Sequence, residues 1–494
     1  MSGVEGTEPR GGWLEQRLGL RALRTALFDR PVPSGLTWWH TLGSATLTVF
    51  LVQVVTGTVL ATFYAPSPDH AYESIRFLEQ QVVAGRLLRG VHNWGASAMV
   101  VLVMLHMVRV FSMGAYKYPR EANWVLGVGL FGLVLAFGFT GYLLPWDQRA
   151  YWATQVGTSI AGTAPFIGGA LATVLKGGSQ LGAATLTRFY ALHVLWLPAA
   201  VVVMVALHLT MVIRQGIAAP ARVLEEGAPG RTDDPTYPAH HAAAEGASKR
   251  EGVRFWPDVI AKDVIVATLT IALLLVLAMA FGAPLEAPAD PTDSSYVPTP
   301  EWYFLPFYQL LKLFPGSMEA TIAVGVPALL VLALVGLPFF DRNSKRHLSG
   351  RPVALTSLAL LLGGSGLLLG AAVREMQSSA EPVSGRMLGS AERAGRALFE
   401  RQCASCHVVD GNGGDEGPEL TDIGARRSTA WLHSFIENPL NFRPESKMPA
   451  FGAPTLSHPE IEEIARYLSA LRGPPGRELE LNIADTFPEP PPPR

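Results

Sequence analysis

Four histidines in two long apolar stretches constrain this chain more than any other feature. His92 and His106 share one stretch, and His193 and His208 share another. On an α-helix, which turns about 100° per residue, a separation of fourteen residues returns a side chain to within about 40° of its first face and raises it by about 21 Å. The fifteen residues of the second pair return it to within about 60°. Two such helices side by side would present two histidine pairs at two depths.

Neutral imidazole is a common metal ligand, so each pair could hold one haem iron from both sides. A lone histidine in an apolar run is more often packed or hydrogen-bonded than a ligand. Four at matched spacing are harder to explain in that way, because ionisable groups inside a membrane are costly and usually functional. The pattern therefore predicts two non-covalent b-type haems.

The length of the apolar stretches predicts an integral membrane protein. The 494 residues are 49% hydrophobic and 16% charged, and repeated apolar runs have the length that spans a bilayer. We expect spans at 42–64, 91–113, 124–144, 190–213, 263–283, 319–339 and 353–373. The predicted fold is all-α, a seven-span transmembrane bundle of four haem-binding helices and three further helices, with a small soluble α-helical domain. Nothing in the net charge of −2 indicates a nucleic-acid partner.

The distribution of basic residues predicts the orientation of the chain. The arginines of the first forty residues suggest an amphipathic helix at the membrane surface, and no cleavable signal peptide is expected. With the N-terminus in the cytoplasm, the basic connections between spans also lie in the cytoplasm. Seven crossings then place everything after residue 373 outside. His240 and His241 are expected at the surface of the cytoplasmic loop.

Two of the predicted spans carry glycines at the histidine spacing. Gly43 and Gly57 lie in the first span, and Gly127 and Gly141 lie in the third. Glycine lets a flat ring or a second backbone approach a helix closely. Alone, such glycines usually indicate helix packing. Because they match the histidine spacing, we interpret them as clearance for a porphyrin at two levels.

Both cysteines of the chain belong to one motif. Cys403 and Cys406 are followed at once by His407, which gives the C-x-x-C-H signature of a covalent c-type haem. A redox dithiol and a zinc site are the alternatives, and the adjacent histidine and the lack of other cysteines disfavour both. Met448, in a Pro-rich loop, is the predicted sixth ligand, since His/Met ligation raises the potential of a haem.

Several stretches resemble cytochrome b of the quinol-oxidising bc complexes. They are Thr46–Val54, Gly141–Gln148, Leu186–Tyr190 and Pro300–Tyr303. The resemblance covers residues 15–373 and is greatest to the photosynthetic form, which is normally split into a four-helix haem protein and a three-helix partner. Both parts are joined in this chain.

The resemblance implies the pairing of the ligands. His92 would pair with His193 at a low-potential haem near the outside, and His106 with His208 at a high-potential haem near the cytoplasm. Arg89 is placed to neutralise a haem propionate, although an arginine that reaches to the membrane interface is the alternative.

Two positions depart from the photosynthetic form. Thr41 stands where those proteins carry a cysteine that binds an additional haem, and Ile213 stands where they carry an arginine beside it. We therefore expect no additional haem and a respiratory role.

Quinol oxidation releases protons, so its site needs a proton acceptor beside an apolar, aromatic pocket. Glu301, in the connection between the fifth and sixth spans, precedes Trp302 and Tyr303 and is the predicted acceptor; a solvated loop glutamate is the alternative. Tyr142 resembles a wall of the same pocket. Asp263 resembles a proton donor at a second, cytoplasmic-side quinone site, but an interfacial anchor is also plausible there.

The C-terminal part resembles the small soluble cytochromes c. Gly395, Phe399 and Tyr467 resemble the crossing of that family's first and last helices, and Gly417 and Pro418 the loop that supports the ligand histidine. The expected domains are 1–214 (four spans and two b haems), 215–261 (cytoplasmic loop), 262–373 (three spans and the quinol-site loop), 374–390 (linker), 391–474 (cytochrome c domain) and 475–494 (Pro-rich tail).

The combined expectation is the cytochrome b/c fusion subunit of a respiratory bc complex, a quinol:cytochrome c oxidoreductase of a bacterial inner membrane. One electron from quinol would pass to a Rieske iron–sulfur protein and the c haem, and the other through the b haems to quinone, coupled to proton translocation. The expected partners are a separate Rieske protein, the quinone pool, a cytochrome c or terminal oxidase, and a second copy in a homodimer. The alternatives are a dihaem membrane anchor of a quinone-linked dehydrogenase, a class that lacks the Pro-Glu-Trp-Tyr loop, and a non-catalytic redox-docking or sensing protein.

Overall fold

The computed structural model describes residues 12–29, 31–291, 299–314, 317–380, 390–414, 416–444 and 446–471. Most of the expected linker and the whole Pro-rich tail lie outside these residues. The chain divides into two compact units. The first comprises Met1–Ala289 and Pro298–Leu369, and the second comprises Asp290–Val297 and Gly370–Arg494.

Within the described residues, seven helices are long and apolar enough to cross a membrane, which confirms the predicted all-α, multi-pass fold. The spans are Trp38–Phe63, Gly85–Ser112, Glu121–Tyr142, Ala183–Gln215, Phe255–Phe281, Met318–Phe340 and Pro352–Met376. They contain α3 (Leu42–Phe63), α5 (Gly85–Ser112), α6 (Glu121–Tyr142), α9 (Ala183–Ala191), α10 (Leu197–Gln215), α13 (Ile260–Phe281), α15 (Ser317–Phe340) and α16 (Pro352–Ala380).

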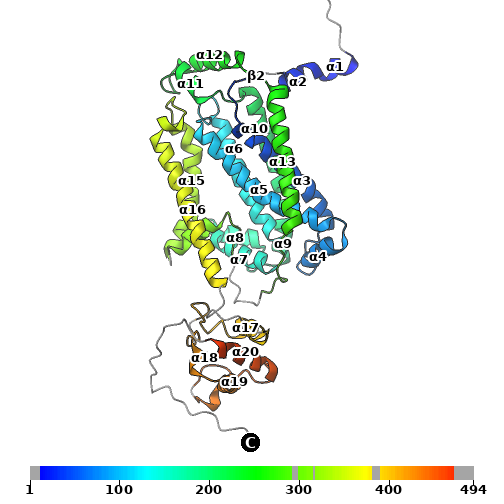
Figure 1. Cartoon of the computed structure of the whole chain (residues 1–494), viewed down its shortest axis with the longest axis vertical. Helices are drawn as coiled ribbons and strands as arrows, with labels where there is room; N and C mark the ends of the chain where they lie inside the picture. Colours follow the sequence, from blue (N-terminus) through cyan, green and yellow to red (C-terminus); the bar gives the residue numbers. More distant parts are fainter. Residues whose placement is uncertain are drawn as a thin grey trace, which may run out of the picture. The chain divides into compact units, whose positions relative to one another are not determined.

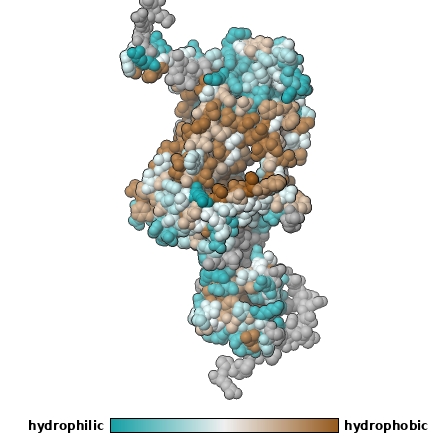
Figure 2. Space-filling view, turned by 180° about the vertical axis from the view of Figure 1, so that it is seen from behind, coloured by the Kyte–Doolittle hydropathy of each residue, from teal (hydrophilic) through white to brown (hydrophobic). Residues whose placement is uncertain are grey.

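The outer surface of this bundle is apolar, as a lipid environment requires. Figure 2 shows hydrophobic residues over the middle of the helices and hydrophilic residues gathered at one end. The outward-facing side chains include Leu51, Val55, Val203, Leu273, Val276, Leu329, Leu332 and Leu360, each more than half exposed.

The helices pack in an order that brings the two histidine-bearing spans into one bundle (Figure 1). α3 lies along α5, and α13 packs against both, with Val49, Met99 and Leu274 buried between them. On the other side α10 and α15 pack against α6. Trp124 of α6 also donates a hydrogen bond from its indole Nε1 to the Leu334 carbonyl of α15, at 2.6 Å.

The fourth span contains a π-helical turn. η2 (Leu192–Trp196) separates α9 from α10, and Pro198 lies in the first turn of α10. Proline has no backbone N–H, so it removes one hydrogen bond of an α-helical ladder. The i→i+5 bonding of a π turn takes in one more residue than an α turn. The turn therefore absorbs the extra residue that separates His193 from His208.

Shorter helices cover the two ends of the bundle. At one end lie α4 (Ala71–Gln81), α7 (Gln148–Gly162), α8 (Gly168–Lys176) and α14 (Leu305–Lys312), and at the other lie α11 (Ala221–Gly227) and α12 (Tyr237–Arg250). The N-terminal segment forms α1 (Trp13–Leu18) and α2 (Leu20–Leu27). β1 (Pro31–Val32) and β2 (Val253–Arg254) form an antiparallel pair.

The expectation of a surface loop at 215–261 is therefore wrong in part. Its helix α12 packs against α11, and His241 of α12 is buried, whereas His240 is exposed as predicted. His241 Nδ1 lies 3.7 Å from Glu245 Oε2, one turn further along α12. Burial lowers the pKa of His241 to about 4, which keeps this imidazole neutral at physiological pH.

The second unit contains α17 (Ser390–Gln402), α18 (Ile423–Arg426), α19 (Thr429–Glu437) and α20 (His458–Ala470). α17 crosses α20 at Gly395, where an added Cβ would lie 1.9 Å from the Glu463 carbonyl oxygen. The Phe399 and Tyr467 rings meet beside this point with centroids 5.6 Å apart. The predicted helix crossing is thus confirmed.

Candidate functional site

Each of the four membrane histidines lies against one of the four glycines. On one side, α3 faces α5. A Cβ on Gly57 would lie 3.0 Å from His92 Cε1, and a Cβ on Gly43 would lie 3.2 Å from His106 Cε1. Real Cβ atoms are rarely this close to a neighbour, so a side chain at either position would displace the imidazole ring.

The same arrangement recurs on the other side, between α6 and the fourth span. A Cβ on Gly141 would lie 2.6 Å from His193 Cε1, and a Cβ on Gly127 would lie 3.9 Å from His208 Cε1. The structure therefore brings the glycines and histidines together at two levels, which are called here the His92 level and the His106 level.

The rings of His92 and His193 face one another across the bundle. Their centroids are 6.4 Å apart and their planes are inclined by 73°. Two imidazoles on opposite sides of one metal ion have centroids about 6 Å apart, because each metal–nitrogen bond is about 2 Å long. The spacing therefore fits one haem iron between these two rings.

Two threonines fix the orientation of these rings. Thr56 Oγ1 lies 2.9 Å from His92 Nδ1, and Thr140 Oγ1 lies 3.1 Å from His193 Nδ1. Each hydroxyl also donates to a backbone carbonyl one turn earlier in its own helix, at 2.7 and 2.8 Å. Each Nδ1–H then donates to the threonine oxygen, which leaves Nε2 as the metal-binding atom.

Sequence reasoning missed the two threonines, although a signal for them exists. Each immediately precedes one of the glycines, so that Thr56-Gly57 in α3 and Thr140-Gly141 in α6 form a repeated dipeptide. The glycine gives the ring room and the threonine one position earlier binds its Nδ1.

A second missed residue is Arg109, which follows His106 by one turn of α5. Its Nε is buried without a hydrogen-bond partner among the described residues. A buried, unpartnered guanidinium nitrogen calls for an anionic group. It therefore fits the propionate of a haem at the His106 level.

Arg89, which was predicted to neutralise a propionate, has protein partners in the structure. It forms a buried ion pair with Glu79 of α4 and donates to the carbonyls of Ala283 and Pro284, beyond α13. These contacts tie α4 and the chain after α13 to α5. A propionate would have to compete with them, so this role stays a prediction.

The loop that carries Glu301 packs near the His92 level. Trp302 Nε1 donates to Ser97 Oγ of α5 at 3.3 Å. The Tyr303 hydroxyl lies against α6, where a Cβ on Gly138 would be 2.5 Å from it. Gly138 is one turn before Gly141 on α6, so the loop approaches the helix face that meets His193.

The predicted quinol-site residues come together around an arginine that the sequence analysis did not single out. Arg149 Nη2 lies 3.7 Å from Glu301 Oε1, and Arg149 Cζ lies 5.4 Å from the centroid of the Tyr142 ring. The Tyr142 hydroxyl donates to the Thr299 carbonyl at 3.3 Å. Burial, together with the negative charge of Glu301, raises the pKa of Tyr303, so this phenol stays protonated.

Asp263 lies apart from this cluster, in the first turn of α13. It accepts a hydrogen bond of 2.6 Å from Ser44 Oγ. Ser44 follows Gly43, which faces His106. The structure therefore places Asp263 at the His106 level, at the opposite end of α3 from the glycine that faces His92.

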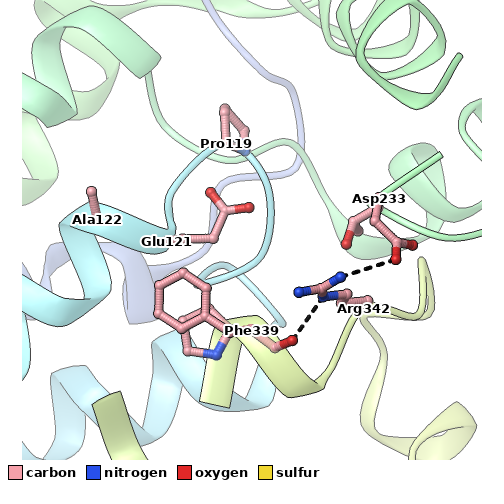
Figure 3. Close-up of a pocket in the computed structure, with 8 residues that line it drawn as sticks. Pro119, Glu121, Ala122, Asp233, Phe339 and Arg342 are labelled. Carbon is pink, nitrogen blue, oxygen red and sulfur yellow. Dashed lines mark hydrogen bonds and ion pairs between the residues drawn. The ribbon is translucent and has the colours of Figure 1, made fainter. Parts of the chain in front are cut away.

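A cavity of about 530 Å³ lies between α6, the end of α15 and the chain before α12. It is lined by Pro119, Glu121, Ala122, Thr232, Asp233, Pro338, Phe339 and Arg342. Figure 3 shows Arg342 joining Asp233 to the Phe339 carbonyl, with distances of 3.1 and 2.8 Å. The cavity contains none of the predicted site residues.

In the second unit the loop at Gly417 and Pro418 holds His407, the predicted ligand. His407 Nδ1–H donates to the Pro418 carbonyl at 2.9 Å, and a Cβ on Gly417 would lie 2.5 Å from His407 Cε1. The imidazole therefore keeps Nε2 for a metal. Gly417 and Pro418 form the supporting loop that the resemblance implied.

The other predicted haem residues of this unit also lie in suitable surroundings. Cys403 is buried in the core and Cys406 is half-buried. Burial raises the pKa of Cys403 to about 12, so its free thiol stays protonated. Met448 packs against the core that contains Cys403 and Ile461. A c-type haem is attached to the protein through two cysteine sulfurs, and its iron is ligated by an imidazole and a methionine thioether.

Comparison with protein-family models finds three matches. The model described as cytochrome b/b6/petB matches residues 27–216, and that of the C-terminal part of cytochrome b (b6/petD) matches residues 288–388. The model of subunit III of the cbb3-type cytochrome c oxidase matches residues 390–468.

Individual proteins agree with these matches. A cytochrome bc complex cytochrome b subunit of Chlorobaculum thiosulfatiphilum is 36% identical over 343 residues, which are 68% of this chain and 74% of the relative. The menaquinol:cytochrome c reductase cytochrome b subunit of Geobacillus thermodenitrificans is 43% identical over 216 residues, 42% of this chain and 96% of the relative. A solved structure titled hyperthermophilic respiratory Complex III aligns with a TM-score of 0.62 and 26% identity, covering 76% of this chain and 92% of that chain.

Proposed function

The chain belongs to the cytochrome b family of bc complexes, and from this premise we propose that it is the fused b/c subunit of a respiratory quinol:cytochrome c oxidoreductase. It oxidises membrane quinol on the external side, delivers electrons to a Rieske protein and to its own c haem, and reduces quinone on the cytoplasmic side with proton translocation. The observation that carries this proposal is the placement of the Glu301 loop, whose Tyr303 hydroxyl lies against Gly138 on the helix face that meets His193, in a bundle that pairs four histidines with four glycines.

The residues that would hold the haems follow from the contacts. His92 and His193 would ligate one b haem, His106 and His208 a second, and the sequence Cys403–His407 with Met448 the c haem. When bound, these haems supply one-electron carriers that conduct across the membrane and onward to the acceptor. Because Thr41 and Ile213 stand where the photosynthetic form carries a cysteine and an arginine, no additional haem is expected.

The protein's own residues supply the proton chemistry. Glu301 accepts a hydroxyl proton of quinol, while Tyr142 and Tyr303 line the site, Tyr303 as a neutral phenol. Asp263, half-buried and hydrogen-bonded to Ser44, protonates the reduced quinone at the His106 level. The two carboxylates work at opposite ends of α3, so proton release and proton uptake occur on opposite sides of the membrane.

The proposed setting is a bacterial inner membrane with the N-terminus in the cytoplasm and the cytochrome c domain outside. The partners are a Rieske iron–sulfur protein, a soluble or membrane cytochrome c or terminal oxidase, and a second copy of the chain. The names of the relatives support an assembly of this kind, because they describe subunits of a bc complex and of a menaquinol:cytochrome c reductase.

Haem content and turnover test the proposal together. We expect a pyridine haemochrome spectrum of the purified chain to give b and c haem in a ratio of about two to one. Glu301→Gln should slow quinol-dependent reduction of cytochrome c at least tenfold, because a lost general base typically costs about 10²–10⁴ in rate, while all haem spectra stay unchanged.

Glu319→Gln is the matched control, since Glu319 is an exposed carboxylate in the first turn of α15. This control should keep the wild-type rate. A Glu301→Gln protein that also keeps the wild-type rate would remove Glu301 from the mechanism. Co-purification of a dehydrogenase subunit in place of a Rieske protein would instead favour the anchor alternative.

A further inference from the structure

The contact between Arg149 and Glu301 assigns a role to a residue that the proposed function does not use. Arg149 lies in the first turn of α7, and its Nη2 is 3.7 Å from Glu301 Oε1. The two side chains are 25% and 23% exposed, so water screens the pair only in part. An opposite charge at about 4–6 Å favours the ionised form of a carboxyl group.

The position of Arg149 is fixed by contacts that do not involve Glu301. Its guanidinium lies over the Tyr142 ring, 5.4 Å from the centroid, which is a favourable cation–π distance. The start of α7 is held by Asp147, whose carboxylate accepts from the N–H of Ala150 at 2.8 Å and from that of Glu286 at 3.0 Å. The arginine therefore meets the Glu301 loop from a prearranged site.

The distance of 3.7 Å is that of an ion pair and is too long for a hydrogen bond. Arg149 therefore attracts the carboxylate without occupying an acceptor position that a quinol hydroxyl needs. Tyr142 lies against the Arg149 guanidinium, Tyr303 stays protonated because burial raises its pKa, and the Asp147 carboxylate is engaged with backbone N–H groups.

We propose that Arg149 is a positioning residue of the quinol site, which holds the Glu301 carboxylate in place through their ion pair until quinol binds and releases it once it is protonated. This inference rests on the proposed function. The O–H bond of quinol breaks, its proton joins a carboxylate oxygen of Glu301, and the electron leaves to the Rieske partner. The neutral carboxyl group is no longer attracted by Arg149 and is free to carry the proton outward.

The test compares Arg149→Met and Arg149→Lys with wild type in the intact complex. The first readout is the infrared band of the protonated Glu301 carboxyl group, assigned by its loss in Glu301→Gln, as a function of pH. The second is the pH profile of quinol oxidation. Arg149→Met should move the band and the acidic limb of the profile to higher pH, because the variant removes an opposite charge that stabilises the carboxylate.

At a pH below that limb the Arg149→Met rate should be about tenfold lower than wild type, whereas at high pH the two rates should be similar. Arg149→Lys should restore most of the wild-type profile. The control is Arg76→Met, since Arg76 is an exposed arginine of α4 that pairs with Glu73 at 3.2 Å, and it should leave band and profile unchanged.

Two outcomes would overturn the inference while leaving the proposed function intact. One is an Arg149→Met protein whose band and profile match wild type. The other is a rate that drops equally at every pH, which indicates a structural role. A wild-type complex that oxidises no quinol at any pH would overturn the proposed function, and this inference with it.

Discussion

At the scale of single residues, four glycines leave room for the four imidazole rings because glycine has no side chain. The four glycines face the edge of an imidazole, and the distance from a built Cβ to the ring varies from 2.6 Å at Gly141 to 3.9 Å at Gly127. The same substitution should therefore have graded effects along one helix, because the neighbouring ring must move further where the clearance is smaller.

We predict that Gly141→Ala lowers the b-haem content by about half or more, since the new methyl group displaces His193 from its position. Gly127→Ala should cause a much smaller loss. Gly132→Ala, on the same helix with nothing within 4 Å of the added Cβ, is the control and should change nothing. Haem content per protein measures the effect, and equal losses for Gly141→Ala and Gly132→Ala would contradict it.

The histidines and glycines could be predicted from the sequence because their relation depends only on helical periodicity. The Thr-Gly dipeptides are a sequence signal for the two threonines, but the pairing of each residue with its partner could not be predicted. The pairing of Thr56 with His92, and of Arg149 with Glu301, depends on which helices become neighbours and how they are rotated. Arg89 is an example. Its position one turn before His92 can be read from the sequence, but its ion pair with Glu79 of α4 depends on tertiary packing.

At the scale of elements, buried ion pairs join the connection between α5 and α6 to the connection between α15 and α16. Lys117 Nζ lies 2.8 Å from Asp341 Oδ1, and Arg351 Nη2 lies 3.2 Å from Asp341 Oδ2. The Lys117 and Arg351 side chains are only 1% and 4% exposed. The cluster thus fastens the three-helix part of the bundle to the four-helix part.

We predict that Asp341→Asn lowers the free energy of unfolding by about 3 kcal/mol, because it leaves two buried cations without their carboxylate. Denaturation by SDS, followed through the b-haem absorbance, would measure the change. Asp233→Asn is the control. Asp233 pairs with Arg231 and Arg342 at the surface, where water screens the charges, so this substitution should cost much less stability. Equal costs for the two variants would refute the argument.

The same carboxylate gives the cluster a pH dependence. Burial alone would raise the pKa of Asp341. Hydrogen bonds from Lys117 and Tyr116 outweigh burial and hold this pKa below its ordinary value. A group whose pKa is lowered on folding contributes stability that is present at neutral pH. This contribution is lost as the pH falls through the lowered pKa.

The seven spans could be predicted because a bilayer requires long apolar helices, and that requirement is visible in composition alone. The short helices of the connections could not. α12 has no strong apolar run, and its buried residues, among them Tyr237 and His241, are covered by α11 and by distant parts of the chain. One such contact joins Tyr237 to Arg346, at 3.3 Å.

At the scale of the whole molecule, two units of different character share one chain. The membrane unit and the C-terminal unit each have their own core, and the residues predicted to bind the c haem all lie in the second. We predict that replacing Cys403 and Cys406 by alanine removes the covalent haem and leaves the b-haem content unchanged. Haem staining of the denatured chain and a haemochrome spectrum measure both, and a parallel loss of b haem would show that the units depend on one another.

The π turn before Pro198 has a consequence for how this chain tolerates change. It lets two imidazoles on one helix stay in register although their separation differs by one from that of His92 and His106. A single deletion or insertion between His193 and His208 would therefore swing one ligand about 100° around the helix axis unless the turn converted to or from α geometry. We therefore expect this span to tolerate substitutions on its lipid-facing side better than a change in its length.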